Sequence, residues 1–144
     1  MLKNFSQAIF TLIASLMLFA CSTVNLDMNA SKDINPNLQS NPSSIMIYVF
    51  QLKEKLAFDS ANFSQINSEE GLKGSVIAKD TYVIQPGEKK EISFSTDDDA
   101  KYIGIAAGYR NINLDWKKVV PVTSHTFSKT YKLKLTSYGM KLTE

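Results

Sequence analysis

The chain has 144 residues, and its 16 lysines and arginines against 14 aspartates and glutamates leave a formal net charge of +2. This near balance, with the basic residues scattered along the chain, argues against a nucleic-acid-binding protein. The single cysteine excludes an internal disulfide, so a hydrophobic core must supply the stability. When the leader predicted below is subtracted, the remaining chain is close in length to the commonest single domains, about 100 to 150 residues.

The beginning of the chain has the pattern of a secretory signal peptide. Lys3 supplies the positive start, and an apolar run over residues 8–20 follows it. Translocation signals combine these two features with small residues before the cleavage site. An uncleaved membrane helix is the alternative, but a span needs about 20 apolar residues. Because polar Ser22 and Thr23 follow the run at once, we predict a signal peptide over residues 1–20.

The apolar run ends in Leu18-Phe19-Ala20-Cys21, which resembles the lipobox of bacterial lipoproteins. In lipoboxes the cysteine thiol receives a diacylglycerol, and the cysteine becomes the new N-terminus. Phe19 departs from this pattern, because a smaller residue is usual there. An ordinary buried thiol is the alternative, since free cysteine is often buried. Its place at the end of a leader favours lipidation of Cys21, and we expect residues 21–23 to be a lipidated N-terminus with a short tether.

A predicted strand opens the domain, which we expect to occupy residues 24–144. Its apolar residues alternate with polar ones, and a period of two places on one face Val24, Leu26, Met28 and Ala30. The strand begins about three residues after the lipid, and at roughly 3.3 to 3.6 Å per residue that tether reaches only about 10 Å. The domain should therefore lie close to its membrane.

A polar segment over residues 33–44 follows this strand. It is rich in asparagine and serine, and Pro36 and Pro42 oppose both helix and central-strand pairing. Loops of this length inside a compact domain are uncommon and often functional. The segment is therefore the first candidate for a binding surface, and a passive connector is the alternative.

A central strand and a short helix are predicted next. Residues 45–52 are apolar on both faces, as expected of a strand covered on both sides. Asp59 is placed as the N-cap of a helix that ends at about Asn67, because Phe58 and Phe63 take the positions of a hydrophobic staple. This helix would press one apolar face onto a sheet.

The rest of the chain has the pattern of short strands separated by turns. They are expected over residues 81–84, 90–95, 102–109, 116–123 and 129–135. In the third of them Gly104, Ala106 and Gly108 share a face with Tyr102, and such small residues let another element approach closely. Many short strands at regular spacing predict an all-β fold, a two-sheet β-sandwich with one short added helix.

The sequence holds no pattern that supports catalysis or metal binding. The only histidine, His125, lies in a polar turn, whereas a triad needs a nucleophile and a base within reach of each other. A zinc site needs several cysteine or histidine ligands. The acidic residues 97–99 are consecutive, so they predict a solvated loop and not a calcium site. We expect a protein that is not an enzyme, with no small-molecule substrate and no cofactor besides the covalent lipid. A hydrolase with two distant acids in a deep pocket is the alternative.

Seven short segments carry further information when they are taken in order. They are the lipobox ending at Cys21, residues 33–36 (DINP), residues 47–52 (IYVFQL), Phe58 with residues 61–63 (ANF), residues 85–88 (QPGE), residues 102–110 (YIGIAAGYR) and Trp116. Together they resemble the TssJ family of type VI secretion lipoproteins. Departures exist, since family members commonly carry arginine where Met46 and Ile47 stand, and Phe50 intrudes before Gln51.

This resemblance implies a transthyretin-like β-sandwich, anchored by lipid in the outer membrane and facing the periplasm. Ser22 agrees, because aspartate after the lipidated cysteine is the familiar signal for the inner membrane. The family binds the periplasmic C-terminal domain of the inner-membrane protein TssM, which forms a membrane complex with TssL. In this family the residues that contact TssM lie in the loop between the first two strands. The expected contact residues are Asp33, Ile34, Asn35, Pro36, Asn37, Leu38, Gln39, Ser40, Asn41 and Pro42.

A different function on the same fold is the remaining alternative, because fold alone does not set function. Such a protein would be another outer-membrane lipoprotein, acting as a pilotin or assembly factor for a different secretion system. The identity of its periplasmic partner would separate the two hypotheses.

Overall fold

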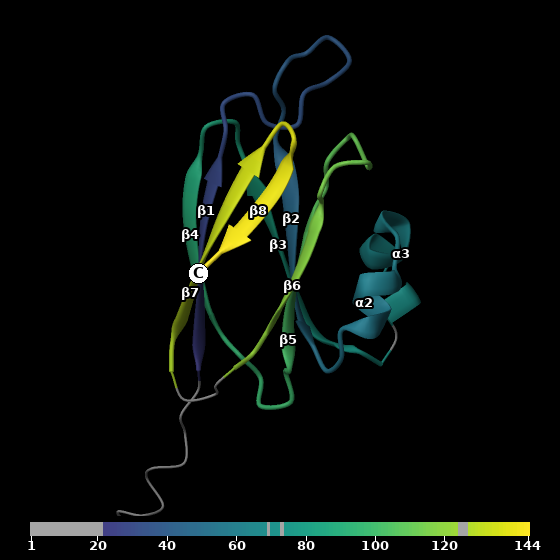
Figure 1. The fold of residues 1–144 in the computed structure, drawn as a ribbon, viewed down its shortest axis with the longest axis vertical. Coiled ribbons are helices and arrows are strands. Elements are labelled where there is room, and N and C mark those ends of the chain that lie inside the picture. The colour runs from purple at the N-terminus through teal and green to yellow at the C-terminus, as the bar shows by residue number, and fades with distance from the viewer. Residues whose placement is uncertain (1–21, 69, 73, 124–126) are drawn as a thin grey trace, which may run out of the picture.

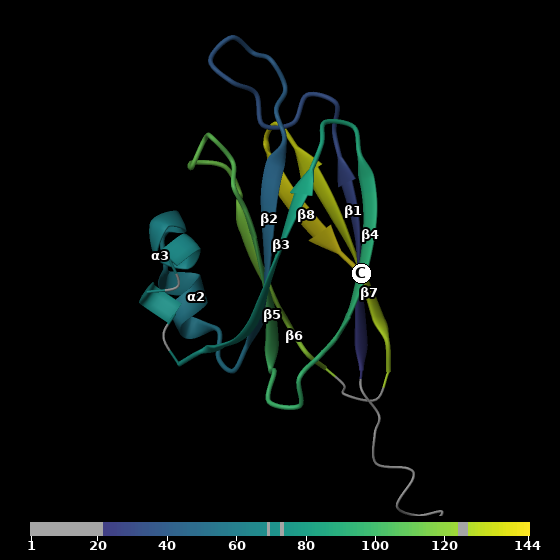
Figure 2. The ribbon, with the colours of Figure 1, turned by 180° about the vertical axis from the view of Figure 1, so that it is seen from behind.

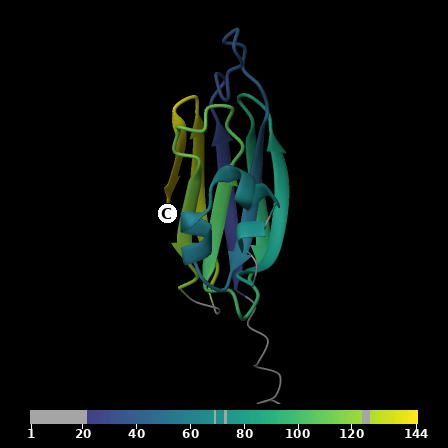
Figure 3. The same cartoon turned by 90° about the vertical axis from the view of Figure 1, so that its right-hand side faces the viewer.

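The computed structural model describes residues 22–68, 70–72, 74–123 and 127–144. The elements in these residues are β1 (Thr23–Ala30), β2 (Ile45–Leu52), α2 (Leu56–Ser60), α3 (Phe63–Ser68), the 3-10 turn η1 (Glu70–Leu72), β3 (Val76–Ile84), β4 (Lys89–Ser95), β5 (Tyr102–Ala107), β6 (Lys117–Pro121), β7 (Lys129–Thr136) and β8 (Gly139–Thr143). The strands form one sheet of order β4-β1-β7-β8 and a second of order β3-β2-β5-β6, which face each other (Figure 1 and Figure 3). The predicted two-sheet β-sandwich is confirmed.

The core between the sheets follows from the period of two in their inner strands. In β1 the four predicted apolar residues are buried, and they meet side chains of β2 and β5 in one cluster. β1 lies between two partners, because it pairs antiparallel with β4 and parallel with β7. The other face of β2 packs in a second cluster, outside the sandwich, that contains Tyr48, Phe50 and Leu52. β2 is thus covered on both sides, as its apolar sequence predicts.

The helical segment covers the outer face of the β3-β2-β5-β6 sheet (Figure 1 and Figure 2), and it corrects the predicted single helix. The segment contains two short helices, and Asp59 lies inside α2 instead of capping a helix. The actual capping pair is Asn62 and Gln65. The Asn62 Oδ1 atom accepts from the Gln65 N–H at 3.0 Å, and the Gln65 Oε1 atom accepts from the Asn62 N–H at 2.9 Å. This reciprocal capping box begins α3 three residues after Asp59.

The strip of small residues that begins on β5 lies beneath this helical segment, so another element does approach it closely. A Cβ atom on Gly104 would lie 2.9 Å from two ring atoms of Phe58 and 3.0 Å from the Leu52 side chain. The Phe58 ring is fully buried and meets the Phe50 ring edge-on, with 5.5 Å between the centroids. Gly104 is therefore needed because the phenylalanine of α2 occupies the space of a side chain.

Lys117 of β6 ties the end of α2 to the sheet. Its Nζ atom donates to the carbonyl oxygens of Phe58 at 3.0 Å and Ala61 at 2.8 Å, and also to that of Asp59. The last carbonyls of a helix lack partners within the helix, and a positive charge is favourable at that end. Burial lowers the pKa of the Lys117 ammonium, and the charge of Asp59 opposes this effect.

Two parts of the sheets were not predicted. β8 forms an edge by antiparallel pairing with β7, and β3 begins at Val76 instead of residue 81. β8 is only five residues long, which is too short for a clear alternation. The first half of β3 is half-buried along its length, so its sequence does not alternate cleanly either.

Tyr109, which follows β5, should make the stability fall at alkaline pH. Its side chain is 5% exposed, and burial raises its pKa to about 12 from the ordinary 10.0, while a backbone contact with Thr136 opposes the rise. The unfolded chain would lose this proton near 10, whereas the folded protein keeps it up to about 12. Folding stability should therefore decrease between these pH values.

We expect the wild type to lose roughly 1 to 2 kcal/mol of unfolding free energy relative to Tyr109→Phe as the pH rises from about 10 to 12. Urea unfolding of both proteins across this pH interval measures the difference in unfolding free energy. Because the two proteins share all other titrating groups, the comparison cancels the contribution of those groups. A difference between the two proteins that stays constant with pH would contradict the role of Tyr109.

Candidate functional site

The loop over residues 33–44 makes up most of the connection from β1 to β2, so it passes from one sheet to the other. It projects beyond the strands at one end of the sandwich (Figure 1 and Figure 2). β1 begins at Thr23 at the opposite end, and eight strand residues at about 3.3 Å each separate the two ends by about 26 Å. The chain therefore enters the sandwich at one end and presents the loop at the other.

The base of this loop is held inside the protein. Ile34 is fully buried, and Asn35 is 4% exposed. The Asn35 side chain donates to the Ser44 carbonyl oxygen at 3.0 Å and accepts from the Arg110 N–H at 2.8 Å. The Ser43 hydroxyl donates to the Asn35 carbonyl oxygen at 2.6 Å. Asn35 also has a φ of 49°, a conformation that asparagine tolerates better than most residues.

The tip of the loop is closed by Asn37. Its Oδ1 atom accepts from the backbone N–H groups of Gln39 and Asn41, each at 2.9 Å, and its own N–H donates to the Asn41 carbonyl oxygen at 2.9 Å. Ser40 has a φ of 62°, which lets the chain turn back. These bonds hold a short arch, on which the apolar side chain of Leu38 is 99% exposed.

The structure divides the ten predicted contact residues into three groups by their exposure. Ile34 and Asn35 face inward, so they can support a contact surface but offer little area to a partner. Asn37 is half-buried and shapes the tip. The solvent-exposed members are Asp33, Pro36, Leu38, Gln39, Ser40, Asn41 and Pro42. The other predicted site residue, Cys21, lies outside the described residues.

Sequence reasoning missed the residues that brace the loop from elsewhere in the chain. Arg110 holds Asn35 through its backbone, and its Nε–H donates to the Ser43 hydroxyl at 3.2 Å. Ser137, in the turn between β7 and β8, donates to the Asp33 carboxylate at 2.8 Å. The one signal of this role in the sequence was that Arg110 is the only arginine of the chain.

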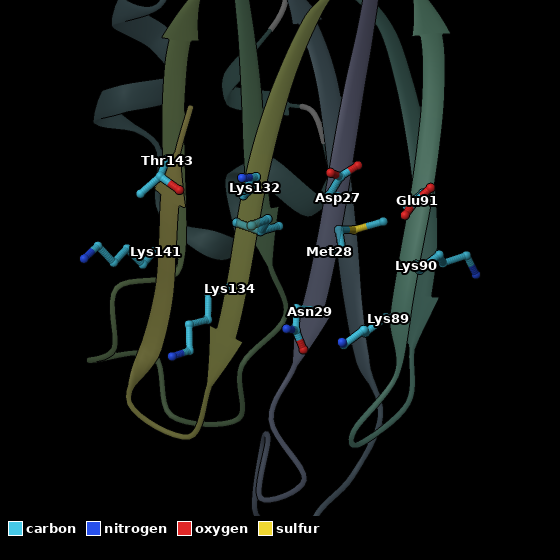
Figure 4. A pocket seen from close by; sticks show the side chains of 11 residues that line it. Asp27, Met28, Asn29, Lys89, Lys90, Glu91, Lys132, Lys134, Lys141 and Thr143 are labelled. Carbon is cyan, nitrogen blue, oxygen red and sulfur yellow. The ribbon is translucent and has the colours of Figure 1, made fainter.

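A hollow of about 650 Å³ lies on the outer face of the β4-β1-β7-β8 sheet (Figure 4). The strand registers align one residue from each of the four strands in a row across the sheet. These residues are Lys89, Asn29, Lys134 and Lys141. Asp27 and Glu91 form the neighbouring pair on β1 and β4. Charged side chains of both signs thus line an open strand surface, whereas small-molecule sites are mostly apolar and concave.

Other predicted features concern metals and membranes. Within the described parts of the chain, no group of three or more histidine, cysteine, aspartate or glutamate side chains is placed to hold a metal ion, and no helix is long and apolar enough to span a bilayer. The acidic residues 97–99 form a turn, in which the Asp97 carboxylate accepts from the Asp99 N–H at 2.9 Å. His125 lies outside the described residues.

Comparison with protein families identifies the chain. Residues 22–138 match the family described as Type VI secretion lipoprotein, VasD, EvfM, TssJ, VC_A0113. The chain belongs to this TssJ family. The predicted resemblance is confirmed, and the family is one of structural lipoproteins of the secretion system, not a known enzyme family.

Solved structures share the TssJ fold with this chain. TssJ1 of Pseudomonas aeruginosa, a T6SS lipoprotein, has a TM-score of 0.79 at 21% identity, and the match covers 85% of this chain and 95% of that one. Lip of Serratia marcescens, a membrane bound component of the Type VI Secretion System, has a TM-score of 0.80 at 21% identity, with 86% and 97% covered.

A third structural match concerns TssM. It is a chain of the structure described as the T6SS protein TssM C-terminal domain from EAEC, with a TM-score of 0.74 at 25% identity, covering 85% of this chain and 98% of that one. A search of curated protein sequences gave no match.

Proposed function

We propose that this TssJ-family protein links two membranes. A lipid on Cys21 would anchor it in the outer membrane facing the periplasm, and the loop over residues 33–44 would bind the periplasmic C-terminal domain of TssM. The protein would thereby connect the outer membrane to the inner-membrane complex of TssM and TssL. The observation that carries this proposal is the placement of the loop at the end of the sandwich opposite Thr23 (Figure 1).

Membership of a lipoprotein family supports the anchor, and the position of β1 supports a short one. β1 begins at Thr23, two residues after Cys21, so the tether can extend only about 7 Å. A single acyl chain holds a protein to a membrane only marginally, whereas two or more chains hold it stably. A lipidated N-terminus with several chains would therefore resist force along the sandwich.

The conformation of the loop supports a role in binding. Its base and tip are held by hydrogen bonds through Asn35 and Asn37, so little conformational entropy remains to be lost when a partner binds. Leu38 is held out in solvent by this arrangement. An exposed apolar side chain on a rigid support is a good anchor for a pocket on another protein. The match to a chain in a structure of the TssM C-terminal domain favours TssM as the partner.

The proposal is tested by the affinity of the protein for the purified periplasmic domain of TssM. We expect Leu38→Asp to weaken binding at least tenfold, because a carboxylate would be buried in place of an apolar anchor. Isothermal titration calorimetry measures the dissociation constant, and circular dichroism checks the fold, which Leu38 does not support because it is fully exposed.

Leu56→Asp is the matched control for this experiment. Leu56 is 72% exposed on α2, at the side of the sandwich, so the same chemical change is made away from the loop. Its affinity for TssM should equal that of the wild type. If Leu38→Asp also bound like the wild type, the assignment of the loop would be wrong, and if the wild-type protein did not bind TssM, the proposed partner would be wrong.

A further inference from the structure

Beside the β3–β4 turn, residues 85–88, three loops meet at the end of the sandwich that carries residues 33–44. The second is the β5–β6 loop, residues 108–116, and the third is the β7–β8 turn, residues 137–138. The two ribbon views from opposite sides place all three at the same end (Figure 1 and Figure 2). We call this surface the three-loop end.

Hydrogen bonds join loop 33–44 to each of the other two loops, and they join the β5–β6 loop to the start of β8, directly after the β7–β8 turn, although these segments are far apart in sequence. Each bond has a donor to acceptor distance of 2.8 Å. The pairs are Arg110 N–H with Asn35 Oδ1, Ser137 Oγ with Asp33 Oδ2, and Met140 N–H with the Asp115 carbonyl oxygen. Asp115 and Gly139 also form a β-bridge, and Gly139 has a φ of 124°, which favours glycine. The three loops therefore form one braced unit.

Each of the three loops holds one large apolar side chain in solvent. Leu38 is 99% exposed, Ile112 is 68% exposed and Tyr138 is 85% exposed. Only seven large apolar side chains are exposed among the described residues, and three of them lie at this one end. Scattered exposed apolar residues need no explanation, but a group of them on a braced surface indicates a contact with another molecule.

Arg110 adds a polar group to the same surface. Its Nε–H donates to Ser43, which holds the guanidinium against the base of loop 33–44 while the residue stays exposed. A guanidinium has five N–H donors, so it can bind a further acceptor on a partner. Arginine and tyrosine are enriched among the residues that dominate binding energy at protein interfaces.

We propose that the three-loop end is a single docking surface, and that Ile112 and Tyr138 are anchors of the same interface as Leu38. This inference rests on the proposed function, so the partner is the periplasmic domain of TssM. That domain should present apolar pockets for these side chains and an acceptor, such as a carboxylate, for Arg110. A specific interface uses about 20 to 30 residues on each side, more than the dozen or so of loop 33–44. The two neighbouring loops supply the missing area.

The test measures the affinity of the lipidated protein in detergent for the periplasmic domain of TssM. We expect Ile112→Asp and Tyr138→Asp each to weaken binding at least tenfold, and their combination to abolish it at micromolar concentrations. Leu56→Asp is the control and should bind like the wild type. Because charged replacements can disturb a loop, Ile112→Ser and Tyr138→Ser are measured too, with thermal unfolding to confirm that each variant is folded.

The possible outcomes separate this inference from the proposed function. If Leu38→Asp weakens binding while all the Ile112 and Tyr138 variants bind like the wild type, loop 33–44 is the contact and the three-loop end is not. If the wild type does not bind TssM, both proposals are overturned. A wild-type dimer in sedimentation analysis that Ile112→Asp and Tyr138→Asp dissociate would also overturn the inference, because the surface would then join two copies of this chain.

Discussion

Replacing Cys21 by serine is expected to move the protein from the outer-membrane fraction to the soluble periplasmic fraction. The hydroxyl cannot take the thioether-linked lipid, and the chain has no second cysteine that could replace it. The effect should be nearly complete, because stable anchoring depends on the combined burial of several acyl chains at about 0.8 kcal/mol per methylene group. Fractionation of cells, followed by immunoblotting of each fraction, measures the change.

The same variant should keep its fold and its partner. The described domain begins at Ser22, whose buried side chain bonds the Thr96 hydroxyl, and no described contact needs a lipid. Purified Cys21→Ser should therefore bind the TssM domain with the affinity of the wild type. Its thermal unfolding temperature should also equal that of wild-type protein from which the lipid has been removed. A variant that stayed in the membrane fraction would show that the lipid on Cys21 is not the anchor.

The strands of the sandwich could be predicted because their signals are local. β1 and β2 have the same bounds in the prediction and in the structure to within one residue, since each carries its period or its apolar run in eight consecutive residues. The helical segment failed for a related reason. Phe58 and Phe63 have the spacing of a hydrophobic staple, but each packs from its own helix onto the cluster around Phe50. The sequence pattern cannot distinguish these two arrangements.

The candidate site could be predicted only in part, because the contacts that shape it join residues far apart along the chain. Composition and prolines located the loop over residues 33–44, because turn chemistry is local. The burial of Asn35 depends on Arg110, which lies 75 residues away, and the bond between Asp33 and Ser137 spans 104 residues. No pattern within the loop could show which residues face inward or which other loops adjoin it.

Gly104→Ala is expected to destabilise the fold by about 1 to 3 kcal/mol, although it adds only one methyl group. The new Cβ atom would lie 2.9 Å from the Phe58 ring, closer than side-chain contacts allow, and the ring is confined by Leu52 and Phe50. Overpacking of a well-packed core costs energy of this order. Urea unfolding followed by circular dichroism measures the change in unfolding free energy.

Gly108→Ala makes the same change at a site with room for it. There the nearest atoms to a new Cβ would be the Met46 carbonyl oxygen at 3.5 Å and the Phe63 ring at 3.6 Å, which are ordinary contacts. Its stability should stay within about 1 kcal/mol of the wild type or rise slightly, because alanine restricts the unfolded chain. Equal destabilisation by the two variants would mean that the backbone, and not the space under α2, requires glycine.

A second substitution tests the contact with Phe58 directly. Phe58→Leu shortens the side chain that the Gly104→Ala methyl group would strike, so the double variant should lose less stability than the sum of the two single changes. Residues in direct contact show coupling of about 0.5 to 3 kcal/mol in such cycles. Affinity for TssM should be unaffected in the folded Gly104→Ala and Phe58→Leu variants and in their combination, because α2 lies at the side of the sandwich and not among the three loops (Figure 1). Strict additivity would mean that the new methyl group and the Phe58 ring do not meet.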